Sequence, residues 1–260
     1  MAHLTLATAA DHVPQALWRD RLALTAAEVC AGIAGRREGA AALRDAVHLT
    51  KAGDDPGPAG RVFRQWSRAV ERPMSVLNLA KALEGGALEG VEPEQIALCL
   101  AATGPTPVDH AAQVLEAMLT DTPHAETAAL IMAEAVLAKS LGWGHVTPLM
   151  SLGLRPRDLR LRGDELRLAC HRAVADGVRK AVPMAGELAR AAVRLRAVVP
   201  KLRAKAAARA VDLFLTRDAL APQALAFMSD RAARRLCDRL VALGALREMT
   251  GRDTFRLYGV

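Results

Sequence analysis

A mainly α-helical fold is expected, with an N-terminal helical bundle or array followed by a C-terminal winged helix-turn-helix that carries a small β-hairpin. The composition is 52% hydrophobic but only 3% aromatic, and alanine and leucine supply much of the apolar content. Such residues favour helices that pack closely together. Apolar residues also recur at helical spacing between Gly/Pro breaks, and this period changes after Gly244.

Residues 1–150 are predicted to form an acidic helical domain. Short Gly/Pro breaks separate segments with a helical apolar period, which is typical of a bundle or an array of helices. The most apolar of these segments contains Leu130, Ile131 and Val136, so we expect its helix to be the most buried. The predicted helices cover residues 13–34, 40–50, 62–71, 75–84, 93–102, 108–120 and 125–141.

The segment from Lys51 to Arg61 is rich in glycine and proline and leads to a helix start. A Gly-rich loop in this position can bind an anion at the helix N-terminus. The segment lacks the Gly-Lys-Ser/Thr of a phosphate-binding loop, and Asp54 and Asp55 would repel phosphate. We therefore predict a turn with helix capping.

Residues 151–199 are predicted to form basic connecting helices, and residues 200–260 the winged helix-turn-helix domain. Pro183 is expected to separate two helices, and a short extended segment is expected before them. The predicted elements are an extended segment at 154–162, connecting helices at 163–182 and 184–199, a first winged-domain helix at 200–215 and a short second helix at 222–227.

The recognition helix is predicted at residues 229–243. Ser229 is a good N-cap because its hydroxyl can accept a hydrogen bond from the first turn. Ala233, Leu236, Cys237, Leu240 and Leu243 form one apolar stripe, whereas the arginines of the segment fall outside it. Gly244 is expected to end the helix.

A wing hairpin is predicted at residues 245–259. Two strand-compatible segments flank Thr250-Gly251-Arg252-Asp253, in which Gly251 can adopt a positive φ. A basic helix, a glycine and a hairpin with a basic tip together resemble the C-terminal winged helix of many bacterial transcription regulators. That resemblance implies that the helix enters the major groove and that Arg252 lies at the wing tip.

The net charge of +7 is unevenly distributed. Residues 1–150 hold 12 Lys+Arg and 17 Asp+Glu, whereas residues 151–260 hold 23 Lys+Arg and 11 Asp+Glu. The two parts therefore carry charges of −5 and +12, which predicts a polyanionic partner, double-stranded DNA, for the basic part. The predicted DNA-binding residues are Arg231, Arg234, Arg235, Arg252, Arg203, Lys205 and Arg209.

Three segments together resemble a family of alphaproteobacterial proteins that is known only as a domain of unknown function. They are the Gly-Asp-Asp-Pro-Gly-Pro-Ala-Gly-Arg loop at 53–61, Pro-Lys-Leu-Arg-Ala-Lys at 200–205 and the terminal segment from Ser229 to Gly259. The resemblance implies that the terminal segment is one unit ending in a winged helix-turn-helix. It implies no activity, substrate or catalytic residue.

Motifs for catalysis are missing from the sequence. The seven histidines form no His-Glu-x-x-His or Glu-x-x-His pair, and neither Gly-x-Ser-x-Gly nor a dinucleotide fingerprint occurs. The four cysteines are far apart in apolar helical patterns, as expected of reduced core cysteines. We therefore expect a non-enzymatic protein without metal or cofactor.

The expected location is the cytoplasm, without membrane insertion. The first residues lack a basic segment and an apolar signal core, and no apolar run reaches the length of a membrane span. The acidic helical part is expected to form a homodimer or to bind a protein partner.

A protein–protein interaction module is the alternative to DNA binding. In that case the winged helix and its basic face would bind an acidic protein. Arginines of residues 229–243 that are exposed together with Arg252 would favour DNA. Arginines paired with carboxylates of the N-terminal half would favour the protein partner.

Overall fold

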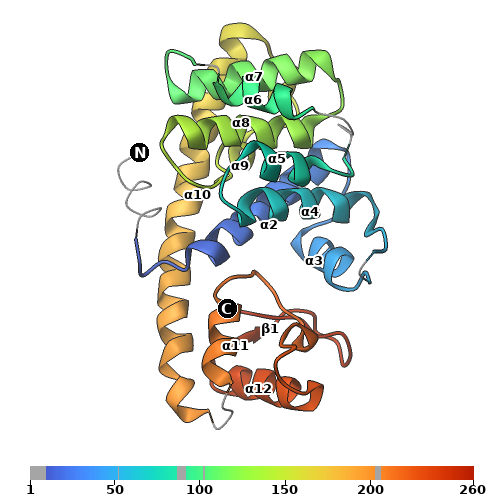
Figure 1. Cartoon of the computed structure of the whole chain (residues 1–260), viewed down its shortest axis with the longest axis vertical. Helices are drawn as coiled ribbons and strands as arrows, with labels where there is room; N and C mark the ends of the chain where they lie inside the picture. The colour runs from blue at the N-terminus through green and yellow to red at the C-terminus, as the bar shows by residue number, and fades with distance from the viewer. Residues whose placement is uncertain (1–9, 52, 87–91, 102, 203–205) are drawn as a thin grey trace. The chain divides into compact units, whose positions relative to one another are not determined.

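The computed structural model describes residues 10–51, 53–86, 92–101, 103–202 and 206–260. The chain divides into two compact units (Figure 1). One unit comprises residues 22–181, and the other comprises the residues up to Arg21 together with 182–260. The predicted division into 1–150, 151–199 and 200–260, which rests on charge and sequence pattern, stays a prediction.

Helices make up the unit of residues 22–181, as expected from its composition. α7 packs along α8, while α4 lies between α3 and α5 (Figure 1). The C-terminal part of α2 (Gln15–Ile33) and the N-terminal part of α10 (Gly163–Ala197) belong to this unit. Its other α-helices are α3 (Ala40–His48), α4 (Gly57–Glu71), α5 (Val76–Leu83), α6 (Pro93–Ala101), α7 (Pro107–Asp121), α8 (Glu126–Ser140) and α9 (Met150–Gly153).

α8 is the centre of this unit, which confirms the expectation of a deeply buried helix. Every residue from Ala128 to Ala138 is buried. A helix that is apolar on all sides is stable only inside the protein. The neighbouring α7 begins at Thr106, whose hydroxyl accepts a hydrogen bond from the Asp109 amide at 3.1 Å.

The core of α8 contains one carboxylate, that of Glu134, which is 0% exposed. Its Oε1 accepts hydrogen bonds from the amides of Leu149 and Ser151, at 2.7 and 2.8 Å, and from the Ser151 hydroxyl at 2.6 Å. Burial raises the pKa of Glu134 to about 7, although these bonds oppose the shift. Glu134 thereby joins α8 to the start of α9.

Two glycines allow α9 to approach α10 closely. A Cβ on Gly177 of α10 would overlap the backbone of Leu149, and one on Gly153 of α9 would overlap the backbone of Ala173. In both cases the added Cβ would meet backbone atoms of the neighbouring segment, and these cannot rotate away as side chains can. Glycine is therefore required at both positions.

The loop before α4 leads into a helix start, as expected, but α4 begins at Gly57 rather than at residue 62, and its N-cap residue, Pro56, makes no side-chain capping hydrogen bond. Asp55 Oδ1 accepts a hydrogen bond from the Gly57 amide at 3.0 Å, and its Oδ2 accepts one from Arg61 Nη1 at 2.7 Å. Proline is tolerated in a first helical turn, so the Gly-Pro pair starts the helix instead of delaying it.

α10 corrects the prediction of two helices separated by Pro183. It is continuous from Gly163 to Ala197 and includes this proline. A proline removes one intrahelical hydrogen bond. Ala181, Ala185 and Leu188 stay buried on either side of it, on one helical face, and this burial maintains the helix.

The extended segment predicted at 154–162 is also corrected. This stretch follows α9 and contains a short 3₁₀ helix, η1 (Asp158–Arg160). The carboxylate of Asp158 accepts a hydrogen bond from the Arg155 amide at 2.9 Å. That bond stabilises a turn and opposes an extended chain.

The described C-terminal part of the second unit contains four helical segments. They are followed by a small sheet (Figure 1). The α-helix predicted at 200–215 is shorter in the structure. A 3₁₀ turn lies at the beginning of this stretch, and the α-helix itself, α11, begins only at Ala207. The elements are η2 (Val199–Lys201), α11 (Ala207–Phe214), η3 (Pro222–Ala224), α12 (Asp230–Ala242), β1 (Arg247–Glu248) and β2 (Tyr258–Gly259).

The sheet is antiparallel and gains a third segment from far along the chain. Arg247 pairs with Gly259 and Glu248 pairs with Tyr258. Leu220 then forms a bridge to Tyr258, in which each residue donates its amide to the carbonyl of the other at 2.9 Å. The hairpin is thereby fixed to the segment between α11 and η3.

The start of α2 is linked to the loop after α11 through charged residues. Asp20 Oδ2 accepts a hydrogen bond from the Asp218 amide at 2.8 Å, and Arg21 forms an ion pair with the Asp218 carboxylate. Asp218 is only 1% exposed, so its charge needs this partner. The link joins positions that are 198 residues apart in sequence.

None of the helices in the described parts of the chain combines the length and apolarity that crossing a membrane requires.

Candidate nucleic-acid interface

α12 has one buried face and one charged, exposed face. The Ser229 hydroxyl accepts a hydrogen bond from the Ala232 amide at 3.4 Å. Ser229 is therefore the N-cap of α12, as predicted. Ala233, Leu236, Cys237 and Leu240 are buried. Four of the five residues of the predicted apolar stripe therefore form the inner face of this helix, and the arginines are left on the outside. The fifth, Leu243, is the half-buried C-cap.

Arg231, Arg234 and Arg235 are all exposed. Arg234 forms an ion pair with Asp230 of its own helix, at 3.0 Å between Nη2 and Oδ2. Arg235 Nε donates to the carbonyl oxygen of Arg231 at 3.4 Å.

Arg239 is a further exposed arginine of α12 and was not among the predicted DNA-binding residues. It lies four residues after Arg235 and eight after Arg231, so the three residues share one side of the helix. This helical spacing is the signal that could have identified Arg239.

The hairpin after α12 carries the predicted basic tip. Gly244 ends the helix with a φ of +67°, and Gly251 adopts a φ of +63° in the turn between the strands. Arg252 is exposed beside it. The turn is stabilised by Glu248, whose carboxylate accepts hydrogen bonds from the amides of Thr250 and Gly251 at 2.7 and 2.8 Å. These bonds lower the pKa of Glu248 against the opposing effect of burial.

Asp238 connects the hairpin to α12. Its Oδ1 accepts a hydrogen bond from the Tyr258 hydroxyl at 3.3 Å and lies 3.8 Å from Arg256 Nη1. Arg256 Nε also donates to the carbonyl oxygen of Arg252 at 2.7 Å. The turn of the hairpin and the exposed face of α12 are therefore linked through a short series of polar contacts.

An aromatic ring extends the exposed surface of the hairpin. Phe255 is 72% exposed and has a φ of +56°. A positive φ is unusual for a bulky residue. Phe255 lies in the second of the two segments that were expected to form strands, so its exposed side chain was not predicted.

The remaining predicted DNA-binding residues lie near α11 or outside the described residues. The guanidinium of Arg209 lies over the ring of Phe227, 4.3 Å from its centroid. This cation–π contact occupies one face of the guanidinium. Arg203 and Lys205 lie outside the described residues.

The described residues provide little for covalent or metal chemistry. They contain no group of three or more His, Cys, Asp or Glu side chains that could hold a metal ion. The thiols of Cys30, Cys170 and Cys237 are buried, and burial raises the pKa of each to about 12. Such thiols stay protonated at neutral pH and are poor nucleophiles.

The chain belongs to the family described as protein of unknown function (DUF1403), whose model matches residues 1–260. No curated protein and no solved structure matches the chain.

Proposed function

We propose that this member of the DUF1403 family is a DNA-binding protein that acts as a transcriptional regulator. The segment from α11 to β2 would serve as a winged helix-turn-helix. Its order of helix, sheet segment, short helix, longer helix and hairpin is the order found in that fold. The bridge between Leu220 and Tyr258 supports this assignment, because a winged helix closes its hairpin with a third strand.

The exposed arginine face of α12 is the observation that carries the proposal. Arg231, Arg234 and Arg235 face solvent while the opposite side of the helix is buried. Both side chains of the ion pair between Arg234 and Asp230 are exposed, and exposed pairs of this kind contribute little to the free energy of folding. These guanidinium groups are therefore available to phosphates at small cost.

In the proposed mechanism α12 enters the major groove. Its arginines contact phosphates and the O6 and N7 atoms of guanine, since arginine is the commonest bidentate reader of guanine. Arg252 contacts the backbone or the minor groove from the wing. Arg203, Lys205 and Arg209 add attraction to phosphates that does not depend on sequence.

A triple variant of α12, in which Arg231, Arg234 and Arg235 are replaced by alanine, tests the proposal. We expect its affinity for a labelled duplex to fall about tenfold or more at low salt, because three phosphate or base contacts are lost. Fluorescence anisotropy with the full chain measures this. Circular dichroism verifies that the variant retains its helices, which is expected because all three side chains are exposed.

A matched control removes the same charge elsewhere. Arg160, Arg172 and Arg196 are exposed and lie outside the proposed interface, so replacing all three by alanine should change the affinity less than about threefold. An equal loss in both triple variants would mean that the basic charge, and not α12, attracts the duplex.

Wild-type protein that fails to bind any duplex at low salt would instead support the alternative, an interaction module for an acidic protein. The acidic helical part, residues 1–150, is the part that we propose for dimerisation or for binding a protein partner. Sedimentation velocity of the full chain would detect a homodimer.

A further inference from the structure

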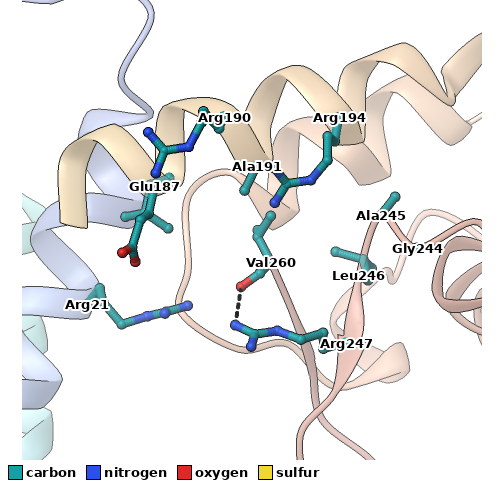
Figure 2. Close-up of a pocket in the computed structure, with 11 residues that line it drawn as sticks. Arg21, Glu187, Arg190, Ala191, Arg194, Gly244, Ala245, Leu246, Arg247 and Val260 are labelled. Carbon is teal, nitrogen blue, oxygen red and sulfur yellow. Dashed lines mark hydrogen bonds between the residues drawn. The ribbon is translucent and has the colours of Figure 1, made fainter. Parts of the chain in front are cut away.

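A second basic site lies beside the turn that follows α12, in a pocket of about 340 Å³. Its residues all belong to the unit that contains α12. Figure 2 shows Arg190 and Arg194 of α10 on one side and Arg247 of β1 across from them. Arg21 and Glu187 complete the charged lining, and the turn of Gly244, Ala245 and Leu246 forms part of the wall.

The charge in this pocket is unbalanced. Arg21 is paired with Asp218, and Arg247 Nη2 donates to the carbonyl oxygen of Val260 at 3.3 Å. Within the described residues, the side chains of Arg190 and Arg194 have neither an ion-pair nor a hydrogen-bond partner. Glu187 is the one carboxylate side chain in the lining. Two guanidinium groups without a partner and one carboxylate side chain therefore line this space, so positive charge is in excess.

The positions of Arg190 and Arg194 follow from the sequence. They are four residues apart on α10, so both project from one face of that helix. The neighbouring Leu188 and Ala191 are buried and fix the orientation of the helix at this point. Two guanidinium groups that project from neighbouring turns of one helix suit a ligand with two acidic groups, because each can form a bidentate contact.

We propose that this pocket binds a small polyanion whose acidic groups are phosphates or carboxylates, held by Arg190 and Arg194 with Arg247 opposite. The volume is at the lower end of the range for ligand pockets, so the ligand is a small metabolite. It would contact the turn that joins α12 to β1. The proposal does not depend on DNA binding by α12.

Isothermal titration calorimetry of the full chain tests the proposal in a low-salt buffer that contains neither phosphate nor carboxylate. Pyrophosphate is the probe in one arm and citrate in the other. Saturable binding of at least one probe is expected, and the tighter arm shows whether phosphate or carboxylate groups are preferred. The Arg190→Gln, Arg194→Gln double variant should bind that probe about tenfold or more weakly.

Two further variants separate the pocket from general charge. Arg172→Gln with Arg196→Gln removes the same charge from exposed positions of α10 outside the pocket and should leave the affinity unchanged. Glu187→Gln removes the opposing carboxylate and should tighten binding about threefold or more. A gain of binding cannot result from misfolding.

The proposal is overturned if the wild type binds neither probe, or if the Arg190, Arg194 variant binds as tightly as the wild type. It is also overturned if the Arg172, Arg196 variant loses as much affinity, since net charge would then explain the binding.

Discussion

Replacing Gly177 with alanine is expected to lower the free energy of unfolding by about 2–4 kcal/mol. The new Cβ would lie 2.7 Å from the carbonyl carbon and 2.9 Å from the Cα of Leu149, and closer still to its carbonyl oxygen. These are backbone atoms, so α9 must move away from α10 to relieve the overlap. Such a movement would also disturb the hydrogen bonds that Glu134 accepts from Leu149 and Ser151.

The same substitution at Gly186 is the control, because it lies in the same helix. A Cβ there would meet only the end of the Arg190 side chain, at 3.6 Å. Alanine favours a helix more than glycine does, so Gly186→Ala should raise the free energy of unfolding by about 0.5–1 kcal/mol. Urea denaturation followed by far-UV circular dichroism measures both. Destabilisation of the same size in the two variants would show that the approach of α9 to α10 is not the cause.

Glu134→Ala is expected to lower the free energy of unfolding by about 3–5 kcal/mol. It removes the acceptor for the amides of Leu149 and Ser151 and for the Ser151 hydroxyl, and all of these donors are buried. The cavity left by the side chain adds to this cost.

The pKa of Glu134 adds a pH dependence with a defined sign. Burial raises this pKa from 4.5 to about 7, so the folded protein binds the proton more tightly than the unfolded chain. The contribution of Glu134 to the free energy of unfolding is fully present below about pH 4.5 and is lost as the pH rises through about 7. The total change is about 3 kcal/mol.

The Glu134→Gln variant is the reference for this pH dependence, because glutamine keeps the Oε1 acceptor but does not titrate. Relative to this variant, the wild type should lose stability between about pH 5 and about pH 7, as measured by urea denaturation at each pH. Parallel curves for the two proteins would show that Glu134 does not titrate in this range.

Local patterns in the sequence predicted the helices well where the chain carries a strong local signal. The start of α12 at Ser229 and its end at Gly244 were predicted from capping residues, and its buried face from apolar spacing. The start of α4 was misplaced because Gly-Pro marks either a loop or a first helical turn. Pro183 was read as a break because the apolar face that maintains α10 through it depends on packing partners far along the chain.

The parts that depend on distant contacts were not predictable from one sequence. The third segment of the sheet pairs Leu220 with Tyr258, and the link from Asp20 to Asp218 spans most of the chain. The pocket around Arg190 and Arg194 likewise arises only when α10 meets the turn after α12. The charge asymmetry predicted a basic surface on the C-terminal part, but not that arginines would also line a pocket there.

DNA affinity measured across a salt series tests the DNA-binding proposal most directly. For the wild type, the logarithm of the association constant should fall linearly with the logarithm of the salt concentration, with a slope of about 0.9 per phosphate contact. The α12 triple variant should have a slope smaller by about two to three such contacts. An unchanged slope in that variant would contradict the proposal, because the duplex would then be bound elsewhere on the protein.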